Sequence, residues 1–175
     1  MSRTDAISGE LRSMRAGVDR ARSTASATAQ EAEQVATRAA AAGFNGIAAG
    51  MSQVRGAIGN IQAGLGNIDG AIDQASTSVV AVPREASPAE VVEALNRAAD
   101  RVGTAHDGVG SSISDVEEAR TLVVRVLQGG DPGPLLSMLG TIKEILSLVA
   151  QQGSAVKQSL ASAVNDARRT GNSGN

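Results

Sequence analysis

A stripe of apolar residues with alternating spacings of four and three runs through residues 47–79. This spacing places the side chains along one narrow line of an α-helix, the a and d positions of a heptad, and it lacks the every-second-residue alternation that a strand needs. The stripe consists of Ile47, Met51, Val54, Ile58, Ile61, Leu65, Ile68, Ile72, Ala75 and Val79. A helix with such a stripe needs other helices to bury it, so the pattern predicts a helical bundle.

The same stretch contains six glycines, each of which disfavours a helix by about 1 kcal/mol relative to alanine. Burial of the large apolar side chains returns about 1.5–3 kcal/mol each, so we expect this helix to form only within the bundle. Small residues also recur at every seventh position beside the stripe, and they predict a close approach by a neighbouring helix. We expect that neighbour to be the alanine-rich half of the preceding helix. The small residues are Gly50, Ala57, Gly64, Ala71 and Ser78.

Three further stretches carry the same four-three spacing and predict helices over residues 4–42, 88–127 and 135–167. In the third of the four helices, the stripe is expected to pass through Ala99, His106, Ile113 and Arg120. Short segments rich in glycine and proline separate the helices, and short connections make consecutive helices antiparallel.

The boundaries divide the chain into two helical hairpins, residues 1–82 and 88–167. Val82-Pro83 ends the second helix, and Ser87-Pro88-Ala89-Glu90 begins the third with the pattern of a capping box. We expect the polar residues 168–175 to be disordered. The fold class that follows is all-α, an antiparallel up-down-up-down four-helix bundle built from two long helical hairpins.

Composition limits the chemistry of the chain. It has one Phe and no Trp or Tyr, which suits thin, closely packed helices and argues against the stacking platforms that bind bases or sugars. A net charge of −2 with mixed signs points to no polyanionic partner, and the absence of Cys excludes disulfides and thiolate chemistry. His106 is the only histidine, so we expect it to be packed or half-exposed, and we expect no metal, no cofactor and no catalytic site.

The two stretches that could direct membrane insertion, residues 1–20 and 135–150, do not have the required pattern. Residues 1–20 contain Asp5, Glu10 and Asp19, which is incompatible with the apolar core of a cleavable signal peptide. The most apolar window, residues 135–150, is too short to span a bilayer and is interrupted by Lys143 and Glu144. We therefore expect no membrane-spanning segment.

Two sets of apolar residues stand outside the helix stripes and are the candidate partner-binding sites. Phe44-Asn45-Gly46 lies in the first hairpin turn, where the ring either caps the end of the core or serves as a recognition anchor. Leu136, Ile145 and Leu148, with Met138, widen the apolar surface of the fourth helix. They either lie between two neighbouring helices of the same chain, which we favour, or form a patch for another chain.

A hairpin of two long, alanine-rich helices with an aromatic-x-Gly turn, here Phe44-Asn45-Gly46, resembles the Trp-x-Gly helical-hairpin proteins that are substrates of actinobacterial type VII secretion. The resemblance covers residues 1–82, with Phe in place of Trp. The family's Tyr-x-x-x-Asp/Glu export signal is absent, because the chain has no Tyr. The sequence style, rich in Ala, Arg, Gly and Val with little Lys, is also similar to helical proteins of high-GC actinomycetes. The resemblance implies export without a conventional signal peptide as an alternative to a cytoplasmic location.

These observations favour a non-enzymatic interaction or scaffold protein that binds a protein partner or itself through helix faces. The alternative is a helical bundle that binds lipid surfaces or apolar ligands reversibly, which the missing Trp and the weak basic stripe disfavour. Nucleic-acid binding has only a short run of arginines in its favour, whose simpler explanation is a solvated helix face. The run consists of Arg12, Arg15, Arg20 and Arg22.

Overall fold

The computed structural model describes residues 3–83 and 85–172 and contains the four helices that the sequence predicts. No strand occurs in these two ranges. The helices are α1 (Arg3–Ala41), α2 (Asn45–Val80), α3 (Pro88–Val126) and α4 (Gly133–Asn172). The all-α fold class is therefore confirmed.

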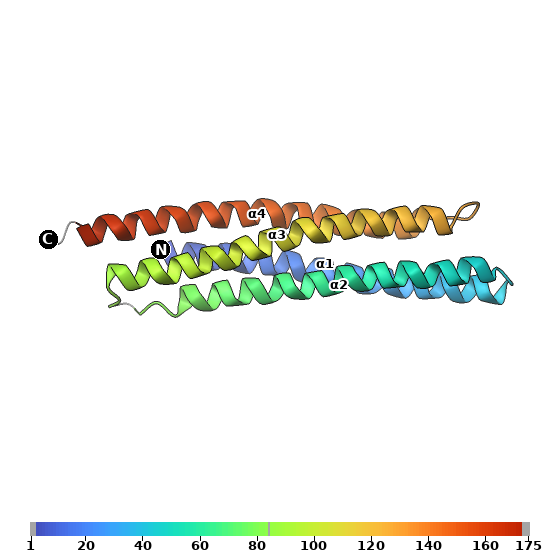
Figure 1. Ribbon diagram of the computed structural model, residues 1–175, viewed down its shortest axis with the longest axis horizontal. Helices are drawn as coiled ribbons and strands as arrows, with labels where there is room; N and C mark the ends of the chain where they lie inside the picture. The colour runs from blue at the N-terminus through green and yellow to red at the C-terminus, as the bar shows by residue number, and fades with distance from the viewer. Residues whose placement is uncertain (1–2, 84, 173–175) are drawn as a thin grey trace.

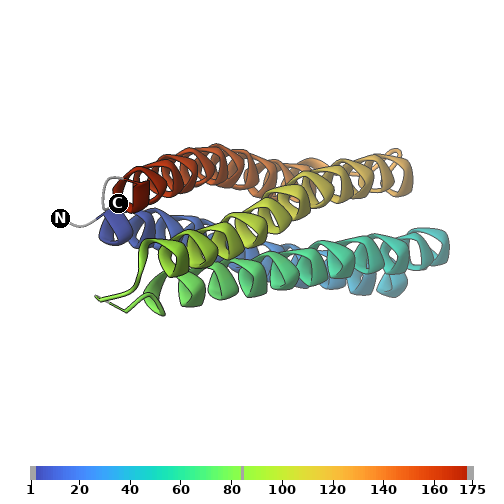
Figure 2. The ribbon, with the colours of Figure 1, turned by 60° about the vertical axis from the view of Figure 1, so that its left-hand side comes forward.

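The helices form a closed ring in which each one touches the two that adjoin it. Within the described residues, α1 contacts α2 and α4, α3 contacts α2 and α4, and the diagonal pairs make no contact. Figures 1 and 2 show α1 and α2 in one layer and α3 and α4 in the other. Both hairpin turns lie at one end of the molecule, and the α2–α3 connection lies at the other (Figure 1). This is the expected up-down-up-down arrangement.

Side-chain contacts fix the antiparallel direction of neighbouring helices. Arg15 near the start of α1 pairs with Asp73 near the end of α2, whereas Glu33 near the end of α1 pairs with Arg55. Hydrogen bonding of Arg3 to Ser162 shows the same reversal between α1 and α4. Long antiparallel neighbours of this kind bury a continuous apolar stripe from end to end.

The core is built from the predicted stripes of α1, α2 and α4 together with buried residues of α3. In α2, every residue of the stripe except Ile47 is buried, and the stripe of α1 is buried from Ile7 through Ala32. The largest side chains that are almost fully buried are Ile7, Leu11, Met14, Met51, Ile58, Ile61, Leu65, Ile68, Ile72, Leu95, Leu135 and Leu139. Aliphatic side chains therefore fill the core without any aromatic ring.

In α3 the predicted stripe is half wrong. Ala99, His106, Ile113 and Arg120 are only partly buried, and the residues just before them face the core instead. Those are Ala98, Ala105, Ser112 and Ala119, all at most 1% exposed. The reason is the close approach of α2, which leaves room on that line of α3 only for small side chains.

The small residues of α2 face α3 rather than α1, which corrects the expected partner. A Cβ added to Gly64 would lie 2.6 Å from Ser112 Oγ, and one added to Gly50 would lie 2.7 Å from Val126 Cγ1. These distances are shorter than van der Waals contact, so a larger residue fits at Gly64 only if the Ser112 hydroxyl moves, and at Gly50 only if Val126 shifts. Small residues on both helices therefore allow α2 and α3 to pack closely.

The capping box at the start of α3 is confirmed. Ser87 Oγ accepts a hydrogen bond from the Glu90 backbone N–H at 3.4 Å, and Glu90 Oε2 accepts one from the Ser87 backbone N–H at 2.7 Å. Hydrogen bonds from the hydroxyl and backbone of Ser87 lower the pKa of Glu90 below its ordinary value. The capping box gives α3 a defined first residue immediately after the connection.

The polar tail differs from the expectation. Residues 168–172 continue α4 as helix, and residues 173–175 lie outside the described part. The last turn packs on the start of α3, where a Cβ added to Gly171 would lie 3.2 Å from Pro88 Cβ. Contact with α3 therefore extends the helix beyond the point where the apolar stripe ends.

Candidate interaction surfaces

The first candidate surface is the turn between α1 and α2. Gly43 has φ +81°, its N–H donates to Ala40 O at 3.0 Å, and the Phe44 N–H donates to Ala39 O at 2.8 Å. This pair of hydrogen bonds around a left-handed glycine is the Schellman motif, which ends a helix sharply. The motif fixes the backbone of Phe44 directly at the tip of the hairpin.

Phe44 points away from the core. Its side chain is 60% exposed and does not belong to the apolar core, so the alternative in which it caps the core is wrong. Asn45 and Gly46 are also exposed. No residue from 39 to 54 carries a formal charge, which makes this tip an uncharged surface around the chain's only aromatic ring. Its role as a recognition anchor stays a prediction.

The second candidate surface, on α4, is divided. Leu136 and Ile145 are partly buried against the core, as expected for burial within the chain, whereas Leu148 is 52% exposed. Leu148 lines an open hollow of about 580 Å³ together with Arg120 of α3 and with Lys143 and other residues of α4. The exposed part of this candidate surface is therefore centred on Leu148.

Ion pairs border this hollow and join α3 to α4. Glu117 Oε1 lies 2.5 Å from Lys143 Nζ and 3.2 Å from Arg120 Nη1. The hydrogen bond from Lys143, with help from both positive charges, lowers the pKa of Glu117 below its ordinary value of 4.5, although partial desolvation opposes the shift. Both basic groups beside Leu148 are thus already paired with a carboxylate of their own chain.

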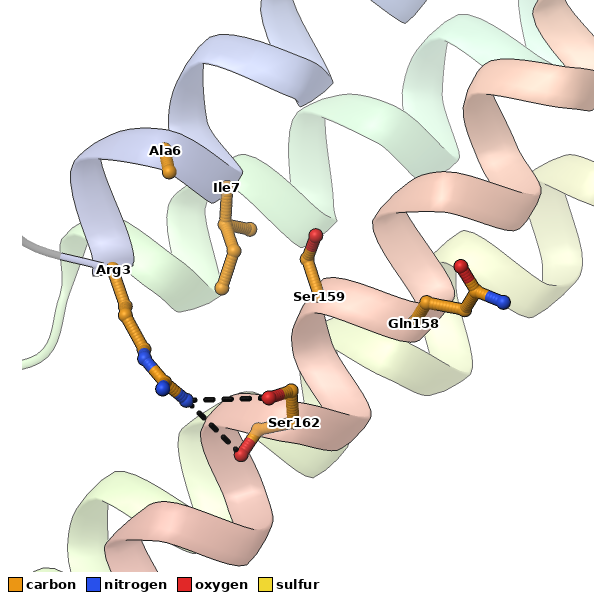
Figure 3. A pocket seen from close by; sticks show the side chains of 6 residues that line it. All are labelled: Arg3, Ala6, Ile7, Gln158, Ser159 and Ser162. Atoms are coloured by element: carbon orange, nitrogen blue, oxygen red, sulfur yellow. Dashed lines mark hydrogen bonds between the residues drawn. The ribbon is translucent and has the colours of Figure 1, made fainter.

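A smaller hollow of about 330 Å³ lies between the first turns of α1 and residues 158–162 of α4 (Figure 3). Arg3 reaches across it from α1 and donates to Ser162 Oγ at 3.2 Å and to Ser162 O at 3.4 Å. Arg3 also forms an ion pair with Asp166. Its cation is therefore used to join the two helices, and the hollow offers no free charge for a ligand.

The arginine run of α1 is divided between pairing and solvent. Arg15 contacts both Asp69 and Asp73 of α2, and Arg22 contacts Asp69 at 3.4 Å. Arg20 is exposed, and its guanidinium has no partner among the residues that the structure describes. Half of the run thus ties α1 to α2, which favours the solvated-face explanation over an anion-binding surface.

His106 is partly buried on the α4 side of α3. A Cβ added to Gly153 would lie 3.2 Å from its Nδ1 and 3.3 Å from Met14 Cε, so the ring occupies the space that the glycine leaves open. Residues 3–83 and 85–172 contain no group of three or more His, Asp or Glu that could hold a metal ion. The imidazole therefore packs between helices as a space-filling group.

α4 is the one helix in the described chain that is long and apolar enough to cross a membrane by length and composition. It contains an 18-residue window of mean hydropathy 1.3, of which 28% is buried inside the bundle. The core helix of a bundle passes the same test. Apart from its buried stripe, this helix has Leu136 and Ile145 packed against the core and Leu148 exposed.

Comparison with known proteins gives one partial match. Residues 86–172 match the model of a family of unknown function (DUF6244). This segment contains α3 and α4 and none of α1 or α2. No curated protein and no solved structure matches the sequence.

Proposed function

We propose that the protein is a non-enzymatic interaction or scaffold protein whose partner is another protein bound by surface shape. The observation that carries the proposal is the exposed Phe44 ring, held at the tip of the first hairpin by the Schellman motif of Gly43. A lone aromatic side chain on a rigid, uncharged turn is typical of a binding hot spot. Leu148 on α4 supplies the second exposed apolar contact.

Several features support a role without catalysis. The side chains that commonly act as general acids or bases are spread along helix surfaces, and many of them are tied into ion pairs such as Arg97–Glu93 and Arg38–Glu31. The hollows on the described surface are open and lie at helix junctions. A binding protein needs only the long faces and the exposed tip, and it needs no cofactor.

Affinity capture from the native host tests the proposal. The full chain, Phe44→Ala and Leu148→Glu are compared with Val80→Ala, a matched control that removes another exposed apolar side chain. We expect Phe44→Ala to lose partners that wild type and Val80→Ala retain, with unchanged helicity by circular dichroism. If both Phe44→Ala and Leu148→Glu retain every partner of the wild type, the binding surfaces have been placed wrongly.

The location proposed for this function is the cytoplasm or, after export without a conventional signal peptide, the cell exterior. The secretion-associated version is supported only by the hairpin resemblance around Phe44-Asn45-Gly46. Immunodetection in washed cells and in culture medium separates the two locations. Release into the medium that stops when the host's secretion ATPase is deleted supports the exported version, and retention in the cells contradicts it.

A second candidate function is reversible binding to lipid surfaces or apolar ligands, which the apolar window of α4 favours. In this mode the helices open and lay their stripes on the interface. Flotation with liposomes tests it directly. Co-flotation that Leu148→Glu abolishes supports lipid binding, whereas a protein that stays at the bottom of the gradient excludes this mode.

A further inference from the structure

The outward face of α2 has a regular pattern that packing within the chain does not require. Four carboxamide side chains follow one another at every seventh position and therefore form one row along the helix. All four are exposed, and within the part of the chain that the structure describes none of these side-chain amides has a hydrogen-bond partner. They are Gln53, Asn60, Asn67 and Gln74. Asn60 and Asn67 lie at equal sequence distances from the peptide bond between Ala63 and Gly64, and so do Gln53 and Gln74. This peptide bond is therefore the midpoint of the row.

The amide row lies on the α3 side of α2. Gln53 and Asn60 line an open groove of about 270 Å³ with Asp115, Glu118 and Leu122 of α3. On the other side of the same face, the charges of α2 form ion pairs with α1. Arg55 Nη1 lies 2.5 Å from Glu33, and Asp73 Oδ1 lies 3.0 Å from Arg15.

Arg55 and Asp73 have opposite charges. They lie at nearly equal sequence distances on either side of the Ala63–Gly64 midpoint of the amide row. Between Arg55 and Asp69, α2 has no charged residue. The charges that α2 itself carries are therefore positive toward one end of the face and negative toward the other, each paired with an opposite charge of α1, and the centre is uncharged. A helix with this distribution is complementary in charge to an antiparallel copy of itself.

A row of glycines lies between the amide row and the side of α2 that forms ion pairs with α1. Gly56, Gly59, Gly66 and Gly70 are exposed, and a Cβ added to any of them would meet nothing within 4 Å. Packing within the monomer thus gives no reason for these four glycines. They leave enough room for another helix to approach closely without a clash of side chains.

We propose that this face of α2 binds the same face of a second copy of the chain, with the two α2 helices antiparallel about a twofold axis through the Ala63–Gly64 midpoint. The axis places Asn60 opposite Asn67 of the second copy, and Gln53 opposite Gln74 of the second copy. Each carboxamide both donates and accepts, so such pairs form reciprocal hydrogen bonds. Arg55 comes level with Asp73 of the second copy, which extends both ion pairs into a network of alternating charge.

A second copy is the occupant that this pattern fits, because a twofold interface requires one surface to be complementary to itself. The contact runs over residues 52–77, about 39 Å of helix at 1.5 Å per residue. One helix pair lies at the lower end of specific interface sizes, so we expect a dimer with Kd of about 1–100 µM. This inference does not depend on the proposed function, because neither Phe44 nor Leu148 lies on the α2 face.

Sedimentation equilibrium of the full chain tests the dimer and its register. Wild type is expected to change from monomer to dimer within that range of concentration. The variant Asn60→Asp/Asn67→Asp places like charges opposite each other across the axis, and it should raise Kd at least tenfold. The variant Asn60→Lys/Asn67→Asp places opposite charges there, and it should dimerise at least as tightly as wild type.

Two glycine variants identify the face. Gly59→Arg should dissociate the dimer, whereas Gly110→Arg, at an equally open and exposed glycine of α3, should not. Circular dichroism confirms that each variant remains folded. A wild type that stays monomeric at about 0.5 mM overturns the proposal. A dimer that persists in Gly59→Arg also overturns it. The same holds if Asn60→Asp/Asn67→Asp and Asn60→Lys/Asn67→Asp change the Kd by the same factor.

Discussion

Two faces of α2 carry glycines for opposite reasons. On the face toward α3, a Cβ at Gly64 would lie 2.6 Å from Ser112 Oγ, and a Cβ at Gly50 would lie within 2.8 Å of both methyl groups of Val126. On the outward face, a Cβ at Gly56 or Gly66 would meet nothing within 4 Å. The first set allows two helices to approach closely, whereas the second set has no steric partner in the monomer.

The comparison teaches that helix propensity and packing have to be weighed position by position. Every glycine lowers the stability of a helix by about 1 kcal/mol relative to alanine. On the inner face, close packing against α3 offsets this loss, because burial of apolar surface grows as the helices approach. On the outward face no contact within the chain offsets it, so substitution there should stabilise the monomer.

The largest difference between the faces is expected for a large side chain. Gly64→Leu forces α2 away from Ser112 and should lower the free energy of unfolding by about 3 kcal/mol. Gly66→Leu, two residues away on the outward face, is the matched control and should be neutral or stabilising. Urea denaturation followed by circular dichroism measures both. Equal losses for the two variants would show that the faces do not differ in packing.

Substitution of alanine for glycine should change the free energy of unfolding in opposite directions on the face toward α3 and on the outward face. Gly50→Ala meets both methyl groups and Cβ of Val126, and it should destabilise the protein by about 1 kcal/mol after its gain in helix propensity is subtracted. Gly56→Ala has the propensity gain alone and should stabilise the monomer by about 0.5–1 kcal/mol. Thermal unfolding of dilute protein distinguishes them. A shift of the same sign in both would contradict the comparison.

Removal of a serine hydroxyl should also affect stability differently at the buried contact between α2 and α3 and on the exposed face of α2. Ser112 is 1% exposed and its Oγ has no hydrogen-bond partner in the described structure, so Ser112→Ala removes an unsatisfied buried group. We expect a gain of about 0.5–1 kcal/mol in the free energy of unfolding. Ser52→Ala on the exposed face should change it by less than about 0.5 kcal/mol. A clear loss for Ser112→Ala would mean that the hydroxyl makes a stabilising contact.

The smallest effect is expected on the opposite side of α3, where Glu117 pairs with Lys143 at an exposed rim. The pKa of Glu117 is lowered in the folded protein, so its contribution to stability is present above pH 4.5 and is lost as the pH falls through the lowered value. Melting temperatures between pH 6 and about pH 3 should therefore fall slightly less in Glu117→Gln than in wild type. Identical pH profiles would show that this pair contributes nothing measurable.

Much of the fold follows from the sequence because large apolar residues mark helix faces clearly. The stripe of α2, the capping box at Ser87 and the glycine turn at residue 43 all appear where the sequence predicts them. In α3 the same method chose Ala99 and Ile113 instead of Ala98 and Ser112. Small residues differ too little in hydropathy to show which side of α3 faces the core. That side is determined by the glycines of α2, against which α3 packs.

The sequence predicts the candidate surfaces less well than the fold. The exposure of Phe44 depends on a left-handed glycine that turns the backbone outward, and composition alone left core capping open. Similarly, Leu136 and Leu148 differ in exposure because only one of them packs against the core. The amide row of α2 was missed as a possible surface, although its seven-residue spacing is a signal present in the sequence.

The central claim, that the small-residue face of α2 packs directly on α3, can be tested with one disulfide. A Cβ at Gly64 lies 3.9 Å from Ser112 Cβ, close to the mean separation of about 3.8 Å in disulfides, and the chain has no other Cys. Mild oxidation of Gly64→Cys/Ser112→Cys, followed by mass spectrometry, should show a nearly complete intrachain bond. The control Gly66→Cys/Ser112→Cys should keep free thiols. Free thiols in the first variant, or equal bonding in both, would contradict this arrangement of α2 and α3.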